Sequence, residues 1–290
     1  MTVHSSLASP GATRALLEEF GLAAKKRLGQ NFLVSDAVVG RILELAELSP
    51  ADVVLEVGPG IGTLTSALLP HAGAVVAIEA DHDLPPVLAA TCQGLGRMAL
   101  IEGDALRVGA DELRQAVAGL GEPSLPELPN KFVSNLPYQV AATLVLKHLF
   151  ETPAIGRDVV MVQAEVADRI AARPGTKAYG AYTAKLALHA RVTGRFEVAP
   201  GNFMPPPHVD SAVVRIERAP LVDAATAARV APVIDAAFAQ RRKTIRNSMS
   251  ASGFGKDALD AAFAACGIAP TARAETLAPE RFVELAAALG

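Results

Sequence analysis

Short apolar runs alternate with amphipathic stretches over the first two-thirds of the chain. The runs read DVVLEVG, AVVAIEA, ALIEGDA, KFVSNLP and DVVMVQ, and they lie between Asp52 and Gln163. Such runs are typical of strands buried on both faces, which occur in parallel sheets connected by helices. Ahead of the first run, SDAVVGRILELAEL has apolar positions at helical spacing after a possible cap at Ser35. The pattern predicts a doubly wound, Rossmann-like α/β domain.

The pattern changes after SAVVRIERAP, which ends at Pro220. The remaining stretches are Ala-rich, have a helical period and include no strand-like run of comparable strength. We therefore expect a flexible basic N-terminal arm over residues 1–34, a Rossmann-like domain over 35–220 and a small all-α domain over 221–290.

Composition narrows the class of protein. The 290 residues are 51% hydrophobic, which is enough for real cores, so a folded globular protein is expected. No apolar run approaches the roughly 20 residues that cross a bilayer, and the first residues lack the apolar segment of a secretory signal. We expect a cytoplasmic protein without a membrane partner. The two cysteines and six histidines form no ligand-spaced set, so no metal is predicted.

A net charge of -3 argues against a chain that coats nucleic acid along its whole length. Any RNA site must therefore be local. The candidates fall in two basic clusters: Lys25, Lys26 and Arg27 near the N-terminus, and Arg241, Arg242, Lys243 and Arg246 in QRRKTIRN. A short charge run is more often a solvated face, and that alternative stays open on the charge pattern alone.

A glycine turn follows the first strand in VLEVGPGIGTLT. Gly58, Gly60 and Gly62 let the backbone turn tightly and approach a nucleotide-like cofactor. The spacing differs from that of dinucleotide enzymes, and Glu56 precedes it. A carboxylate would repel a pyrophosphate but attract the sulfonium and ammonium of S-adenosylmethionine. The sequence favours an S-adenosylmethionine-dependent methyltransferase sheet, with glycines that serve only helix packing as the alternative.

Two further carboxylates follow at strand ends. Glu79 closes the second strand about 20 residues beyond the glycines, where Rossmann-type sheets provide an acceptor for ribose hydroxyls. Asp104 closes the third, in position to accept from an adenine amine. Each alone could be a turn residue or a helix cap; together they outline a crevice of adenosyl size.

The stretch VSNLPY ends the fourth strand, so Asn135 should open into the same crevice. The exocyclic amine of adenine is a poor nucleophile because its lone pair is delocalised into the ring. The Asn135 side-chain carbonyl and the Leu136 backbone carbonyl can accept both amine hydrogens and aim the lone pair at a methyl group. Pro137 fixes the carbonyl direction, and Tyr138 offers a ring for base stacking. A strand that merely ends in a proline turn is the alternative.

Several motifs in colinear order resemble one family. KKRLGQNFL, LEVGPGIGTLT, IEAD, GDAL, SNLPY, MVQAEVADRI, FMPPPHVDSAVVRI and QRRKTIRN are similar to the ribosomal RNA adenine N6,N6-dimethyltransferases, most of all the bacterial small-subunit (16S) enzymes. The likeness runs from about Lys25 to the C-terminus. Pro85 and Pro86 depart from the family pattern and should interrupt or delay the helix after IEAD.

The resemblance implies residue roles beyond those read from chemistry. It implies that Asn31 and Leu33 contact the cofactor together with Gly58, Glu79, Asp104 and Asn135. It also implies that KKRLGQNF is a flap over the cofactor, and that Phe203 lies opposite Tyr138 so that the two rings hold an extruded adenine. On chemistry alone, Phe203 would be a core aromatic.

The resemblance implies that the protein dimethylates two adjacent adenosines in a 3′-terminal hairpin loop of 16S rRNA during small-subunit biogenesis. It would act as a monomer on the immature subunit, with QRRKTIRN contacting phosphates. An unstacked loop base is cheaper to extrude than a paired one. Two alternatives stay open: a 23S rRNA adenine methyltransferase of the macrolide-resistance type, and an assembly factor that acts mainly by binding.

Overall fold

The computed structural model describes residues 3–25 and 28–290. The described chain divides into two compact units. The first comprises the residues up to Ala167 together with Val192–Glu217, and the second comprises Asp168–Arg191 and Arg218–Gly290. The division at Arg218 lies close to the expected change of pattern at residue 221. Residues 168–191, however, pack with the helical unit and not with the sheet domain to which the sequence pattern assigns them.

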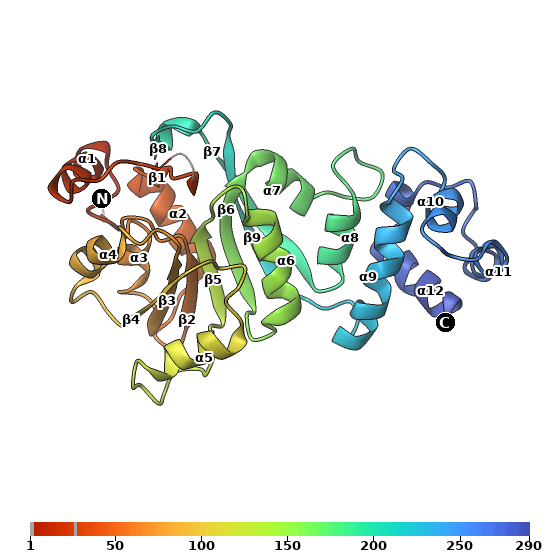
Figure 1. The fold of residues 1–290 in the computed structure, drawn as a ribbon, viewed down its shortest axis with the longest axis horizontal. Coiled ribbons are helices and arrows are strands. Elements are labelled where there is room, and N and C mark those ends of the chain that lie inside the picture. The colour runs from red at the N-terminus through yellow and green to blue at the C-terminus, as the bar shows by residue number, and fades with distance from the viewer. Residues whose placement is uncertain (1–2, 26–27) are drawn as a thin grey trace. The chain divides into compact units, whose positions relative to one another are not determined.

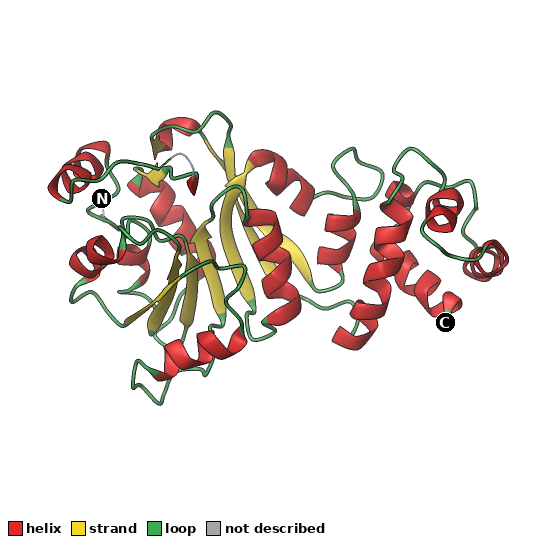
Figure 2. Ribbon diagram, viewed as in Figure 1, coloured by secondary structure: helices red, strands yellow, loops and turns green. Residues whose placement is uncertain are grey.

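In the first unit, the described residues form a seven-stranded sheet of order β4-β3-β2-β5-β6-β9-β7 (Figures 1 and 2). Its strands are β2 (Val53–Val57), β3 (Ala74–Glu79), β4 (Met98–Glu102), β5 (Lys131–Asn135), β6 (Arg157–Gln163), β7 (Ala190–Val198) and β9 (Ser211–Arg218). The pairs β4-β3, β3-β2, β2-β5 and β5-β6 are parallel. The predicted Rossmann-like α/β architecture is confirmed. The apolar pattern did not reveal that β9 runs antiparallel to β6, or that β7 is a strand.

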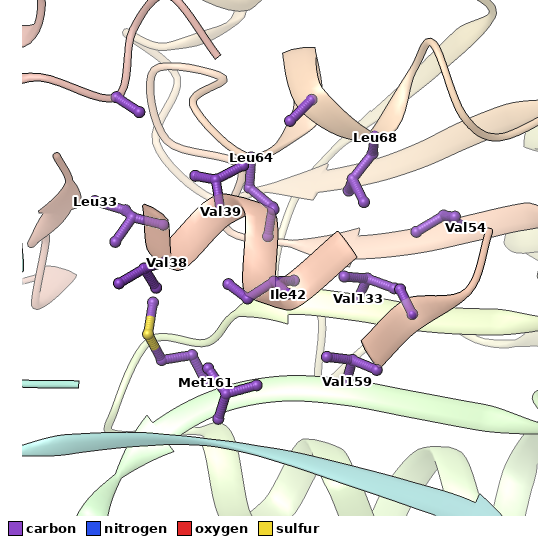
Figure 3. Packing of buried hydrophobic residues seen from close by; sticks show 14 of the residues in the cluster. Leu33, Val38, Val39, Ile42, Val54, Leu64, Leu68, Val133, Val159 and Met161 are labelled. Carbon is purple, nitrogen blue, oxygen red and sulfur yellow. The ribbon is translucent and has the colours of Figure 1, made fainter. Parts of the chain in front are cut away.

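Helices cover both faces of this sheet because adjacent residues of each buried strand point to opposite sides. Val133 of β5 packs with the side chains of α2 (Asp36–Ala46), whereas the neighbouring Phe132 ring meets His148 of α6 (Ala141–Glu151). Figure 3 shows the α2 side of this core, where Val38, Val39 and Ile42 lie over strand residues Val54, Val133 and Val159. Burying each such side chain contributes roughly 1.5–3 kcal/mol, so α2 is firmly held.

The other helices of the first unit are α3 (Thr65–Leu68), α4 (Pro85–Cys92) and α5 (Ala110–Ala118), and α7 (Ala164–Ile170) spans the division between the units. Helix α4 begins at Pro85, so the two prolines occupy its first turn. A proline is well tolerated there because the missing N–H would have no partner within the helix. The sequence predicted this late start.

The N-terminal segment, expected from the sequence to be a flexible arm, contains helical and strand structure. It contains α1 (Pro10–Glu19), whose Leu16 and Leu17 pack with Phe32, Ile61 and Leu84. The same segment forms β1 (Phe32–Leu33), which pairs antiparallel with β8 (Phe203–Met204) after a short 3-10 helix (Pro200–Asn202). Apolar contacts and strand pairing thus fix the segment to the first unit.

The second unit is helical. Its helices are α8 (Ala181–Ala187), α9 (Ala224–Phe238), α10 (Ile245–Ala251), α11 (Lys256–Cys266) and α12 (Pro279–Leu289), with a 3-10 turn at Ala274–Thr276. Tyr179 explains why the segment before α8 belongs here. Its hydroxyl donates to the Leu277 carbonyl at 2.9 Å, and its ring lies 5.9 Å from that of Phe238. Only 1% of Tyr179 is exposed.

No helix in the described ranges is both long and apolar enough to span a membrane.

Candidate active site

A cavity of about 300 Å³ opens at the carboxyl ends of β2, β3, β4 and β5. This is where open α/β sheets bind ligands. Its lining includes ten of the residues singled out from the sequence: Asn31, Leu33, Gly58, Gly60, Glu79, Asp104, Asn135, Leu136, Pro137 and Tyr138. The structure therefore brings together residues from five separate stretches of the chain.

The glycine turn forms one wall of this cavity. Gly58 has φ +69° and Gly60 has φ +60°, both in the left-handed region that side chains disfavour. A Cβ atom at Gly58 would also lie 3.1 Å from the Pro137 ring, and one at Gly60 would lie 3.3 Å from the Phe32 ring. The backbone of β2 can turn here, close to both Pro137 and the N-terminal segment, only because these positions are glycine.

Glu79 lies across the turn, at the end of β3. Its Oε2 accepts from the Gly60 amide at 3.2 Å, and its Oε1 accepts from the Asp81 amide at 2.8 Å. Burial raises the pKa of Glu79, which is 6% exposed. Each oxygen retains a lone pair that can accept from a hydroxyl in the cavity.

Glu56 is the second buried carboxyl of this wall, and only 1% of it is exposed. Burial, with a smaller contribution from the neighbouring charge of Glu79, raises its pKa to about 8. Its Oε2 has no hydrogen-bond partner among the described residues. A buried carboxyl oxygen without a partner is costly, so this group suits a ligand that carries positive charge.

Asp104 differs from these two because it is exposed. Its Oδ1 accepts from the Leu106 amide at 2.9 Å, and its Oδ2 lies 3.8 Å from Arg107 Nε. These contacts fit the turn-residue alternative, while its place in the cavity lining fits contact with a base. The cofactor role of Asp104 stays a prediction.

Asn135 is the last residue of β5. Its Nδ2 donates to the Asn31 carbonyl at 3.4 Å, which turns the amide toward the N-terminal segment. The Leu136 amide donates to the Met161 carbonyl at 3.0 Å and so fixes the following peptide. No hydrogen bond from a described residue reaches Asn135 Oδ1 or the Leu136 carbonyl oxygen. Two acceptors in the cavity lining are thus available to a donor.

Tyr138 is half-buried beside them. Its hydroxyl lies 2.6 Å from Ser211 Oγ, at the buried start of β9, and burial raises the pKa of the phenol. The sequence predicts Tyr138 as a stacking ring but does not reveal this hydrogen bond to Ser211. The one sequence feature that could have indicated this partner is Ser211, a hydroxyl residue at the start of the apolar run SAVVRI.

Phe203 does not line this cavity. Its strand pairs with β1, where it stands opposite Leu33, and its ring joins the core cluster around α2 with 4% exposed. The structure thus shows the core aromatic expected from chemistry alone. The placement opposite Tyr138 that the resemblance implies stays a prediction.

The basic residues of the N-terminal segment are only partly described. Lys26 and Arg27 lie outside the described residues. The Lys25 ammonium binds the Asp81 carboxylate at 2.5 Å and also the Asp83 carboxylate, while Gln30 donates to Asp81 at 2.7 Å. Lys25 is therefore held in an ion pair within the protein, and its expected RNA contact stays a prediction.

The C-terminal basic cluster contains residues with ion pairs and residues without them. Arg246 forms a bidentate pair with Asp260 at 2.6 Å on both arms, and Arg241 binds Glu275 together with two backbone carbonyls. Arg242 and Lys243 are exposed and, within residues 3–25 and 28–290, form no ion pair. The RNA contact expected of all four residues stays a prediction.

No group of three or more metal-ligating side chains occurs in the part of the chain that the structure describes.

Sequence comparison covers nearly the whole chain. The profile of a family described as ribosomal RNA adenine dimethylase matches residues 21–289. The chain is 41% identical to ribosomal RNA small subunit methyltransferase A of Moorella thermoacetica, over 98% of this chain and 99% of the relative. The protein of the same name from Thermobifida fusca is also 41% identical, over 98% of this chain and 97% of the relative.

Solved structures share the fold. A dimethyladenosine transferase from Plasmodium falciparum superposes with a TM-score of 0.72 at 23% identity, covering 88% of this chain and 95% of that chain. The 23S rRNA methyltransferase ErmE superposes with a TM-score of 0.67 at 26% identity, covering 89% of this chain and 99% of that chain. These likenesses confirm the methyltransferase fold, and the sequence matches confirm the family inferred from the motifs. The chain belongs to the ribosomal RNA adenine dimethylases.

Proposed function

We propose that this protein transfers two methyl groups from S-adenosylmethionine to the exocyclic amine of each of two adjacent adenosines in a 3′-terminal hairpin loop of 16S rRNA. The product would be N6,N6-dimethyladenosine in the immature small subunit, made by a monomeric enzyme in the cytoplasm. The observation that carries the proposal is the pair of available acceptors, Asn135 Oδ1 and the Leu136 carbonyl, in a cavity that also holds Glu56 and Glu79.

The cavity suits S-adenosylmethionine on chemical grounds. The unpaired Glu56 Oε2 gives a cationic ligand a buried counter-charge, and the Glu79 oxygens can accept from ribose hydroxyls. The cofactor, when bound, would supply an electrophilic methyl group on a positively charged sulfur. The acceptors of Glu79, Asn135 and Leu136 would come from strand ends of the sheet.

Asn135 and Leu136 would prepare the attacking amine. Each carbonyl accepts one amine hydrogen, which draws electron density to the nitrogen and directs its lone pair toward the methyl carbon. With the methyl group supplied by the bound cofactor, the two carbonyls would hold the nitrogen in place until it loses a proton to water. No base is needed before transfer, because preorganised acceptors stabilise the developing positive charge.

Tyr138 would hold the base. A half-buried ring whose hydroxyl is anchored to Ser211 presents a fixed face, and a base stacked on such a face gains about 1–3 kcal/mol. Because a hairpin-loop adenosine is unpaired, extruding it costs little. In this proposal the second ring is Phe203, which is buried beside β1 in the structure.

The relatives at 41% identity carry a small-subunit name, which supports 16S rRNA over the 23S substrate named for ErmE. The deciding experiment incubates the purified protein and S-adenosylmethionine with 30S or 50S subunits that lack these methyl groups. Mass spectrometry of the digested rRNA should find N6,N6-dimethyladenosine at two adjacent positions of 16S rRNA. Methylated 23S rRNA would support the macrolide-resistance type, and subunit binding without methyl transfer would support an assembly factor.

A further inference from the structure

Asp81 is a buried carboxylate that binds the N-terminal segment and lies just outside the cavity. Only 5% of it is exposed, and it follows closely on Glu79 at the end of β3. Its amide donates to Glu79 Oε1 at 2.8 Å, so its backbone is fixed against the proposed ribose acceptor. The described residues that line the cavity here include Glu79 and Ala80 but not Asp81. Asp81 can therefore act on the reaction only through its neighbours.

Both carboxylate oxygens of Asp81 hold the stretch that leads into β1. Oδ1 binds the Lys25 ammonium at 2.5 Å, and Oδ2 accepts from Gln30 Nε2 at 2.7 Å. Gln30 Oε1 in turn accepts from the Lys25 backbone amide at 2.9 Å. The nitrogen and the oxygen of the Gln30 amide are thus both engaged, so this side chain has one fixed position.

Asn31 lies between this anchor and a second one. On one side it follows Gln30, which Asp81 holds. On the other side Phe32 pairs with Met204, where β1 lies against β8 (Figure 1). The Asn31 side chain also donates from Nδ2 to the Gly29 carbonyl at 2.9 Å. The Asn31 carbonyl is therefore held from both directions along the chain.

That carbonyl is the hydrogen-bond partner of the Asn135 side chain. Asn135 Nδ2 donates to the Asn31 carbonyl oxygen at 3.4 Å. A backbone carbonyl can only accept hydrogen bonds, so it favours Nδ2 on its own side and leaves Oδ1 on the other. An amide turned the other way would present N–H groups to the substrate amine, where the reaction needs an acceptor. The Asn31 carbonyl thus selects the productive orientation of the Asn135 amide.

We propose that Asp81 is a positioning residue for methyl transfer: by holding Gln30, it fixes the Asn31 carbonyl that orients the Asn135 amide. The inference rests on the proposed function, and it gives a residue outside the cavity a part in the chemical step. A contact that only closed the N-terminal segment over the cofactor would change cofactor affinity. A contact that orients the amide changes the rate of transfer even when the cofactor is saturating.

The first experiment observes the Asn135 amide by NMR in the protein without substrate. Its side-chain NH₂ resonances are identified by their loss in Asn135→Ala. Asp81→Asn offers one acceptor oxygen where the carboxylate uses two, so it should shift these resonances and speed their exchange with water. Gln30→Ala breaks the same contact from its other side and should have the same effect.

The matched control is Asp83→Asn. Asp83 is an exposed carboxylate on the same turn, and it also binds the Lys25 ammonium. The substitution is the same as at Asp81, but the bond between Asp81 and Gln30 is kept. The Asn135 resonances should therefore stay at their wild-type positions.

The second experiment measures single-turnover methyl transfer to unmodified 30S subunits at saturating S-adenosylmethionine. Asp81→Asn should slow the chemical step by about 2- to 10-fold, the factor to which one net hydrogen bond corresponds. In the Asn135→Ala background there is no amide to orient, so Asp81→Asn should slow the step no further. Asp83→Asn should keep the wild-type rate.

Wild-type Asn135 resonances in both Asp81→Asn and Gln30→Ala would overturn the positioning role. An equal loss of rate with and without the Asn135 amide would also overturn it, as would a loss of cofactor affinity with an unchanged rate at saturation. Gln30→Ala keeps the test available if Asp81→Asn does not fold. Failure of the proposed function is seen separately, as a wild-type protein that transfers no methyl group to 30S subunits, and the NMR comparison then decides the positioning role alone.

Discussion

The hydroxyl of Tyr138 lies 2.6 Å from Ser211 Oγ, across 73 residues of sequence. Tyr138 follows the end of β5, and Ser211 begins β9, so one hydrogen bond joins the proposed base-stacking ring to the antiparallel strand. Ser211 is fully buried, so removing its partner leaves a buried hydroxyl unpaired. The hydrogen bond fixes the ring face before any base arrives.

This anchor refines the expected effects of changing Tyr138. Tyr138→Ala should weaken engagement of the target base by about 1–3 kcal/mol, the value of one stacked base. Tyr138→Phe keeps the ring and loses the hydrogen bond, at a cost of about 1 kcal/mol in stability. Its KM for 30S subunits should change little. Steady-state kinetics of the two variants, with thermal unfolding as the stability measure, check both values. Equal increases in KM for the Phe and Ala variants would contradict a stacking role.

Glu79 should contribute to cofactor binding. If its carboxylate accepts from ribose hydroxyls, Glu79→Ala should lose about 1.5–3 kcal/mol of S-adenosylmethionine affinity, the value of hydrogen bonds to a charged group. Calorimetric titration measures this directly. Glu102→Ala is the matched control, since Glu102 pairs with Glu79 in the sheet but is exposed and outside the cavity lining. A loss of affinity equal in both variants would argue against the ribose contact.

Glu56 should make cofactor affinity depend on pH. Its pKa of about 8 means that the carboxyl is largely neutral at pH 7, and binding a cation favours the ionised form. Affinity should therefore rise with pH, by up to about tenfold per unit below pH 8, and level off above it. Glu56→Gln should bind more weakly and lose this dependence. A wild-type affinity that is constant from pH 6 to 8.5 would show that Glu56 does not respond to the cofactor charge.

His148 should make the fold sensitive to acid. It is buried against Phe132 with both ring nitrogens unpaired, and burial lowers its pKa to about 4 from the usual 6.5. The unfolded chain binds a proton below pH 6.5 and the folded chain does not, so stability is full above pH 6.5 and falls as pH drops toward 4. The loss should be on the order of 3 kcal/mol. Urea unfolding of wild type and His148→Leu at several pH values isolates this contribution, which should vanish in the variant. If the free energy of unfolding depends on pH in the same way in both proteins, His148 makes no such contribution.

The parallel strands and the cavity could be predicted because short, continuous stretches of the sequence indicate them. Val53–Val57 and Ala74–Glu79 are apolar at every buried position apart from their cavity-facing acids, and Gly58 follows the first of them directly. Strand β7 was missed because it alternates buried and exposed residues and carries two arginines, as strands with one solvated face do.

The remaining differences arise from contacts between distant segments. Lys25 meets Asp81 across 56 residues, and Arg241 meets Lys177 across 64. Charge pattern shows which residues are basic but not which are already paired. Phe203 lies in β8, which pairs with β1. The sequence of either segment alone does not predict this pairing.

The central claim is that Asn135 holds the amine in the geometry of attack. The most direct measurement is single-turnover methyl transfer by Asn135→Ala on unmodified 30S subunits, with cofactor affinity measured in parallel. The account predicts a fall on the order of 10²–10³ in the chemical step, with folding intact. N6-methyladenosine should accumulate, because a monomethylated amine keeps only one hydrogen for the two carbonyls. Asn135→Asp retains an acceptor and should lose less. Transfer of both methyl groups by Asn135→Ala at the wild-type rate would contradict the account.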